Sequence, residues 1–260
     1  MTTITAVGNQ KGGVGKTTTT LGLASADAHL GKRVLVIDMD PQHNATVALG
    51  GMVEGELNVY DALVGTEPGG LADVIRRSTW KGVDVAPGAE ALSLFERDSV
   101  MMAEHRLKLA LDGVDLGQYD VVYIDLPAQL GRLALNGLVV ADQVVVVTVP
   151  EAWAVDGVAA FLKTVGELQR QPMLNPGLRV AGILLNSYDG RLNEHQTRRA
   201  ELHEAYGDLV FDVRAPRLSS AGNMASYGQD LYMAKGGGWR RLVAVYELLA
   251  LTMNNEGARR

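Results

Sequence analysis

The sequence contains no cysteine, which excludes disulfide bonds, iron–sulfur clusters and a thiol nucleophile. Aromatic residues are also few, at 5% of the 260 residues. No apolar run reaches the length of about 20 residues that a membrane-spanning helix needs. The longest such run, Val139 to Val149, is interrupted by Asp142 and Gln143. The N-terminus lacks a basic segment followed by an apolar core, so we expect no signal peptide and a cytoplasmic protein.

Positive charge is in short supply as well. The chain has 24 lysines and arginines against 30 acidic residues, a net charge of −6, which by itself argues against a nucleic-acid partner. The charge is uneven, however. Residues 1–185 sum to −7 and residues 186–260 sum to +1. The last third of the chain therefore has more positive charge to offer to a polyanion.

The chain is rich in apolar residues, at 47%, and it has 30 glycines, which suit many strand–helix turns. Short, continuous apolar runs alternate with helical patterns, and such runs are typical of parallel strands that are covered on both faces. We expect one α/β domain over residues 1–260, a doubly wound, mostly parallel sheet with helices on both faces. The predicted strands are 4–7, 34–37, 82–88, 120–125, 144–150, 178–185 and 209–213. The predicted helices are 16–30, 59–63, 71–75, 91–111, 152–168, 193–206 and 240–253.

The strongest motif is Gln10-Lys11-Gly12-Gly13-Val14-Gly15-Lys16-Thr17-Thr18, between the first predicted strand and the first predicted helix. Its glycines let several backbone N–H groups point into one concave nest, and the helix adds its unpaired N-terminal N–H groups. Lys16 supplies a full charge for the β- and γ-phosphates, and the Thr17 hydroxyl is a hard ligand for Mg²⁺. The motif predicts a binding site for ATP and Mg²⁺ formed by Lys11, Gly12, Gly13, Val14, Gly15, Lys16, Thr17 and Thr18.

One departure from the usual phosphate loop is informative. The position that normally holds the first glycine is Gln10, and a second lysine, Lys11, follows it. This pattern resembles the deviant Walker A motif of the ParA/MinD family of ATPases. The resemblance implies a P-loop NTPase fold and a homodimer that forms with ATP. It also implies that Lys11 reaches across the dimer to the partner's nucleotide, and that Lys11 and Lys16 both serve catalysis.

Acidic residues follow two of the predicted strands. Asp38 and Asp40 come directly after strand 34–37, and Asp125 ends strand 120–125. Ligands of open α/β sheets bind beyond the carboxyl ends of the strands, so we expect all three carboxylates near the phosphate loop. Asp125 is placed like the aspartate that holds Mg²⁺ in such sites, and we expect Asp38 to join it. The segment after Asp38 also resembles ParA, which implies that Asp40 positions the attacking water. The plainer interpretation of Asp38 and Asp40 is that both only cap the turn.

Two further segments resemble ParA proteins. Asn186 ends a predicted strand, where its amide could read the adenine edge or could simply terminate the strand. The segment 188–191 and the Arg217-Leu218-Ser219 segment both match ParA. The resemblance implies that Arg191 and Arg217 bind DNA without sequence preference.

Taken together, the resemblance implies a nucleoid-associated ATPase that dimerises with ATP, binds nonspecific DNA and is stimulated by a ParB-like protein. Its cargo would be a plasmid, a chromosome or another assembly. A MinD-like ATPase that cycles on a membrane is an alternative, but the tail 254–260 has no large apolar residue. A P-loop kinase or ligase would need an acceptor motif, and a sequence-specific repressor would need a recognition helix. The sequence identifies neither.

Overall fold

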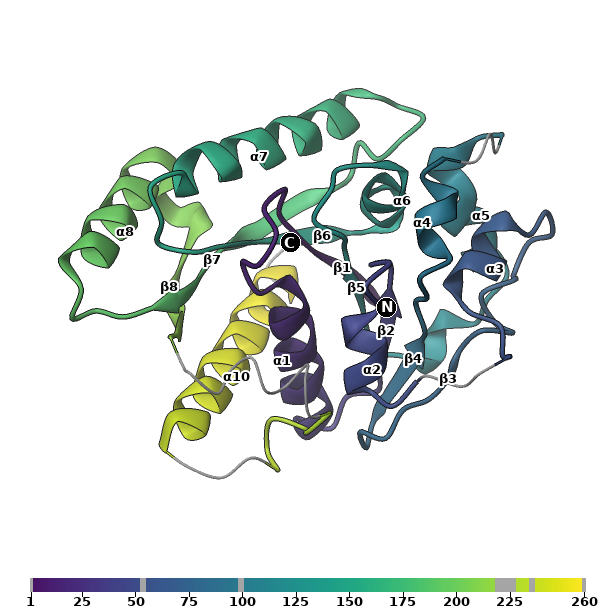
Figure 1. The fold of residues 1–260 in the computed structure, drawn as a ribbon, viewed down its shortest axis with the longest axis horizontal. Helices are drawn as coiled ribbons and strands as arrows, with labels where there is room; N and C mark the ends of the chain where they lie inside the picture. Colours follow the sequence, from purple (N-terminus) through teal and green to yellow (C-terminus); the bar gives the residue numbers. More distant parts are fainter. Residues whose placement is uncertain (1, 52–54, 98–100, 218–227, 234–236, 259–260) are drawn as a thin grey trace.

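A computed structural model describes residues 2–51, 55–97, 101–217, 228–233 and 237–258 (Figure 1). Its eight strands are β1 (Thr3–Gly8), β2 (Val34–Asp38), β3 (Arg76–Arg77), β4 (Val83–Ala86), β5 (Val121–Asp125), β6 (Gln143–Thr148), β7 (Arg179–Tyr188) and β8 (Val210–Pro216). They form one sheet in the order β3-β4-β2-β5-β1-β6-β7-β8. The pairing of β3 with β4 is antiparallel and the other pairings are parallel. The predicted mostly parallel α/β sheet is confirmed.

Helices cover both faces of this sheet, so the fold is doubly wound (Figure 1). One face carries α1 (Lys16–His29), α2 (Asn44–Ala48) and α10 (Gly237–Ala258). The opposite face carries α3 (Val59–Val64), α4 (Leu92–Phe95), α5 (Arg106–Leu111), α6 (Arg132–Val140), α7 (Ala154–Arg170) and α8 (Asn193–Tyr206). Three short 3₁₀ helices complete the described elements: η1 (Ala103–His105), η2 (Leu116–Gln118) and η3 (Gly207–Leu209).

The central strands are buried on both sides because their side chains alternate between two cores. In β2, Leu35 and Ile37 join the core under α3 to α8, whereas Val34 and Val36 join the core under α1 and α10. All four side chains are fully buried. This two-sided burial explains why the strands are continuous apolar runs rather than alternating ones.

The first and last long helices pack directly against each other. Gly22 of α1 faces Tyr246 of α10 so closely that a Cβ atom on Gly22 would lie 2.4 Å from the Tyr246 ring. The ring is fully buried in the core that α1 shares with the sheet. Glycine at position 22 therefore permits the close approach of these two helices.

Two helix predictions are wrong. The predicted helix 91–111 is divided into α4, η1 and α5, with residues 98–100 outside the described part of the chain. Met102 has a φ of 52°, a left-handed conformation that an α-helix cannot continue through. The predicted helix 71–75 is a series of turns. Leu71 and Val74 are buried there, so the apolar pattern marks anchoring into the core and not a helical face.

Candidate functional site

The carboxyl ends of three neighbouring strands meet at one edge of the sheet. Asp125, the last residue of β5, is in register with Val7 of β1 on one side and with Asp38 of β2 on the other. The glycine loop leaves β1 immediately beyond this level. The strand order therefore brings both aspartates beside the loop, as expected from their sequence positions.

Glycine residues shape the loop, which leads directly into the start of α1. Gly13 and Gly15 have φ angles of 75° and 92°, in the left-handed region that glycine adopts at little cost. Among the residues that the structure describes, no side chain caps the start of α1, so its first N–H groups are available to an anion. Within the loop Lys11, Gly12 and Gly13 are exposed, Val14 and Lys16 are buried, and Gly15, Thr17 and Thr18 are half-buried.

Asn186 lies against this loop. Its amide nitrogen donates a hydrogen bond of 2.7 Å to the Val14 carbonyl. A Cβ atom on Gly15 would lie 2.1 Å from the same nitrogen, so another residue at position 15 would displace Asn186 from this hydrogen bond and would also be strained at a φ of 92°. Asn186 also belongs to β7, which runs to Tyr188, three residues beyond the predicted end of this strand. The structure thus shows Asn186 supporting the phosphate loop, and adenine contact stays a prediction.

Lys16 is a buried cation with few hydrogen-bond partners among the described residues. Its side chain is 7% exposed, and among the described residues its ammonium makes one long hydrogen bond, 3.4 Å to the Lys11 carbonyl. Burial lowers the pKa of Lys16, and the charges of Asp125 and Asp40 oppose that shift. A buried ammonium needs charged hydrogen-bond partners, and phosphate oxygens would supply them.

Two buried carboxylates stand behind the loop, each held by threonines. Asp125 accepts hydrogen bonds from the hydroxyls of Thr17 (2.7 Å) and Thr20 (3.0 Å). Asp38 accepts from the backbone N–H (2.8 Å) and the hydroxyl (2.7 Å) of Thr46. Burial raises the pKa of both carboxyls, and the negative charge of Asp38 raises the pKa of Asp125 further. Such a pair of buried acids is stabilised by a cation.

The donor set fits magnesium. No group of three or more histidine, aspartate or glutamate residues in the described part of the chain could hold a metal by itself. Mg²⁺ is usually bound through one or two protein ligands together with phosphate oxygens and waters. The hydroxyl of Thr17 and the carboxylates of Asp125 and Asp38 offer oxygen ligands of this kind beside the loop.

Asp40 and Lys11 lie at the open side of the site. Asp40 is half-buried, its backbone N–H donates to Asp38 (3.1 Å), and its carboxylate accepts from the Gln42 N–H (2.9 Å). The capping interactions of the plainer interpretation are therefore present. Lys11 is exposed, and its ammonium forms an ion pair with Glu151, in the turn after β6.

The two predicted DNA-binding arginines lie at neighbouring strand ends. Arg191 follows β7 and Arg217 follows β8, and the Arg217 N–H donates to the Tyr188 carbonyl at 3.1 Å. The Arg191 side chain is 89% exposed and forms two hydrogen bonds to Asp189, of 2.9 and 2.7 Å. These hydrogen bonds hold the pKa of the Asp189 carboxyl well below its usual range. The structure brings both arginines to one edge of the sheet, where Asp189 would compete with a DNA phosphate for Arg191.

Sequence reasoning missed four residues of this site. Thr20 and Thr46 bind the buried aspartates, Glu151 pairs with Lys11, and Asp189 pairs with Arg191. A signal was present for Thr20, since it lies three residues after Thr17 in a predicted helix and so shares its face. The other three contacts join segments whose approach only the fold reveals.

A glycine loop between a strand and a helix, with a buried lysine and two buried aspartates beside it, defines a nucleotide-binding protein of the P-loop class. A protein-family profile described as an AAA domain matches residues 2–180. The chain is 37% identical to the sporulation initiation inhibitor protein Soj of Bacillus subtilis, covering 88% of this chain and 90% of the relative. It is 40% identical to the chromosome-partitioning ATPase Soj of Thermus thermophilus, covering 87% and 86%.

The fold has solved counterparts. A crystal structure of a cobyrinic acid a,c-diamide synthase from Mycobacterium smegmatis, with bound ATP analog and magnesium, superposes with a TM-score of 0.80 at 30% identity. The superposition covers 99% of this chain and 96% of that one. The chain belongs to the ParA/MinD family of P-loop ATPases, and it is an ATPase whose cofactors are ATP and Mg²⁺. Within the described residues, no helix is both long and apolar enough to cross a membrane.

Proposed function

We propose that the protein is a partition ATPase in which residues 1–260 act as one domain. It dimerises with ATP, binds DNA without sequence preference, and hydrolyses ATP when a ParB-like protein stimulates it. It would work in the cytoplasm on the nucleoid and segregate a plasmid, a chromosome or another cargo. The observation that carries the proposal is the second, exposed lysine, Lys11, beside a loop that already contains the buried Lys16. Support also comes from the partition function named for a relative that is 40% identical.

The loop residues would bind the phosphates of ATP. Lys16 would neutralise phosphate charge, and the N–H groups between Gly12 and Thr18 would surround the phosphate oxygens. Thr17 and Asp125, together with Asp38, would hold Mg²⁺. Bound Mg²⁺ would neutralise charge that develops on the phosphate oxygens during transfer. Asn186 would keep the loop in its binding shape through the Val14 carbonyl.

Hydrolysis requires a group that orients the attacking water. Asp40 suits this role because it is half-buried at the open side of the site and its charge reaches Lys16. A positioned carboxylate of this kind typically contributes about 10²–10⁴-fold to the rate. Asp38 suits it less, since its two oxygens already accept hydrogen bonds from Asp40 and Thr46.

Lys11 would connect the two subunits. In the isolated chain its ammonium is held by Glu151, and both side chains are substantially exposed, at 42% and 61%. Exposed ion pairs typically contribute less than about 1 kcal/mol, so the partner's nucleotide can take over this lysine at small cost. ATP would thereby favour the dimer, because the partner's phosphates become its ligand.

The DNA face would be formed by Arg191 and Arg217 at the ends of β7 and β8. Few phosphate contacts give weak, salt-sensitive binding, especially on a protein with a net charge of −6. A dimer presents the pair of arginines twice, so ATP would switch DNA binding on through valency. Arg214 stacks over the Tyr188 ring, 5.3 Å from its centre, and places a third positive charge near this edge.

The proposal is tested by DNA retention on unrelated duplexes with ADP, ATP or a nonhydrolysable ATP analogue, together with sizing by sedimentation. We expect dimers and DNA binding with ATP or the analogue but not with ADP. Lys11→Ala should bind ATP yet stay monomeric, and Lys16→Ala should lose nucleotide binding. Lys163→Ala, an exposed lysine on α7, is the matched control and should behave as wild type.

Three results would contradict parts of this proposal. A Lys11→Ala protein that dimerises and hydrolyses ATP normally would refute the role of Lys11 across the dimer. DNA binding that survives replacement of both Arg191 and Arg217 would place the DNA face elsewhere. ATP-dependent sedimentation with lipid vesicles, without DNA retention, would favour the membrane-cycling alternative.

A further inference from the structure

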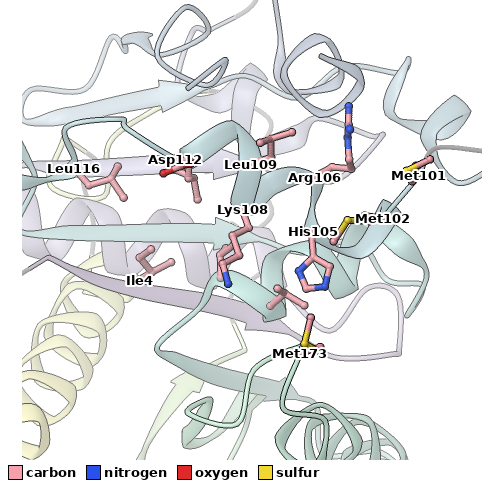
Figure 2. Close-up of a pocket in the computed structure, with 13 residues that line it drawn as sticks. Ile4, Met101, Met102, His105, Arg106, Lys108, Leu109, Asp112, Leu116 and Met173 are labelled. Atoms are coloured by element: carbon pink, nitrogen blue, oxygen red, sulfur yellow. The ribbon is translucent and has the colours of Figure 1, made fainter. Parts of the chain in front are cut away.

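A second hollow lies at the opposite end of the strands from the phosphate loop. It has a volume of about 790 Å³ and begins at Ile4, near the start of β1 (Figure 2). Its walls come from η1 and α5, from Leu116, from the end of α6 and from Met173 after α7. This volume lies within the range of about 300–1,000 Å³ that is typical of small-molecule sites.

The lining is mainly apolar and unusually rich in methionine. Met101, Met102 and Met173 are 82%, 59% and 74% exposed, which is high for side chains of this size and polarity. Methionine is flexible and polarisable, so it adapts to apolar ligands of different shapes. Met102 also has a left-handed backbone, and strained residues of this kind concentrate at binding sites. The other apolar side chains of the lining are Ile4, Leu109, Leu111, Leu116, Val139 and Val140.

The hollow is lined by one acidic residue, Asp112, and by the basic residues His105, Arg106 and Lys108. Figure 2 shows Lys108 and His105 directed toward Ile4 and Met173, whereas Arg106 points away. Arg106 is engaged elsewhere, because its guanidinium donates to the carbonyls of residues 63 and 64 at 2.7 and 3.0 Å.

Lys108 forms no ion pair within the described part of the chain. Among the described residues, no carboxylate lies within ion-pair distance of it, although Asp112 lines the same hollow. An ammonium that faces an apolar hollow without an acidic partner is complementary to an anionic head group attached to an apolar body.

We propose that this hollow binds an anionic amphiphile, such as an aliphatic carboxylate, with its head at Lys108 and its chain among the methionines. The lining residues come from five separate segments of the chain that surround one hollow, so the site suits a compact ligand better than an extended peptide. The site is distinct from the nucleotide site, because it lies near the amino end of β1, whereas the carboxyl end of β1 leads into the phosphate loop. This proposal does not depend on the proposed partition function.

Calorimetric titration of the full-length protein with monomeric hexanoate, octanoate and decanoate tests the apolar part of the site. Burial of each methylene should tighten binding about fourfold until the hollow is filled. Decanol and decylamine test the head group. We expect decanoate to bind more tightly than decanol, and decylamine to bind most weakly because its positive head faces Lys108.

Variants locate the binding site. Lys108→Ala should weaken decanoate binding roughly three- to tenfold and leave decanol binding unchanged. Lys163→Ala is the matched control, since this exposed lysine does not line the hollow. Val140→Trp should place a large ring in the hollow and weaken binding of all three carboxylates. Lys108→Glu should abolish the preference for decanoate, and as a surface change it tests the site even if Val140→Trp does not fold.

Vesicle cosedimentation distinguishes a free amphiphile from a lipid as the source of this chemistry. Sedimentation with anionic but not zwitterionic vesicles, lost in Lys108→Ala, would support the site with a lipid as its ligand. Binding of monomeric decanoate without cosedimentation would support a free amphiphile. Absence of saturable decanoate binding, or binding that Lys108→Ala and Lys163→Ala affect equally, would overturn the proposal. ATP hydrolysis, measured in the same variants, should stay at the wild-type level.

Discussion

Replacing Gly22 with alanine should destabilise the protein, although alanine is the better helix former. The added methyl group would lie 2.4 Å from two carbons of the Tyr246 ring. That ring is fully buried and has little room to move aside. Overpacking typically costs roughly 1–3 kcal/mol, whereas alanine gains about 1 kcal/mol over glycine inside a helix. We expect a net loss of up to about 2 kcal/mol, which lowers Tm by up to about 8 °C in a chain of this size.

Gly166→Ala in α7 is the matched control. Apart from its chain neighbours and the backbone of α7 itself, no described atom lies within 4 Å of the Cβ position at Gly166, so only the gain in helix propensity remains. We expect Tm to rise by about 2–4 °C. Thermal unfolding followed by circular dichroism, without nucleotide, measures both variants. In a Tyr246→Leu background, Gly22→Ala should lose most of its cost. The reasoning is refuted if Gly22→Ala melts at or above the wild-type temperature, or if both glycine variants shift Tm equally.

Three further predictions concern the acidic residues. Asp40→Ala should still bind ATP, but its kcat in a phosphate-release assay should fall roughly 10²–10⁴-fold. Wild-type turnover would show that another group orients the attacking water. Burial raises the pKa of Asp125 above that of the unfolded chain, so its contribution to stability is present at low pH and is lost as pH rises through the raised pKa. Asp125→Asn should therefore reduce the fall in Tm of the nucleotide-free protein between about pH 5 and pH 8, and should weaken Mg²⁺-dependent nucleotide binding. An unchanged pH profile would contradict this. Asp189→Asn should release Arg191 from its ion pair and tighten DNA binding on unrelated duplexes. The slope of log affinity against log salt concentration, measured by fluorescence anisotropy, should steepen by about one unit. An unchanged slope would show that Arg191 contacts no phosphate.

The central strands and their chemistry could be predicted because both depend on local patterns. Strands such as β2 and β5 are continuous apolar runs, and each ends in an aspartate. Parallel order then places these ends together without further information. The phosphate loop is similarly local, since its glycines, lysine and threonine form one uninterrupted segment.

Other parts could not be predicted because they depend on contacts between distant segments. α6 was not expected, and the contacts that anchor it come from a distant segment, since Asn136 bonds the backbone at residues 103 and 107. The break at Met102 is a backbone conformation that no pattern of apolar residues indicates. The ion pair of Lys11 with Glu151 joins residues 140 positions apart. In each case contacts between distant segments determine the local structure, and local sequence propensity does not.

The contact of Asn186 with the phosphate loop implies a very short route between the two ligands of the proposed function. Asn186 holds the Val14 carbonyl, and Arg191 lies only five residues further along the same chain. A nucleotide that shifts this carbonyl acts directly on the strand that presents Arg191, and no relay through the core is needed. Thermodynamic linkage is reciprocal, so any factor by which ATP strengthens DNA binding is also the factor by which DNA strengthens ATP binding. DNA would then act as a cofactor that raises the fraction of the protein with ATP bound at a given ATP concentration.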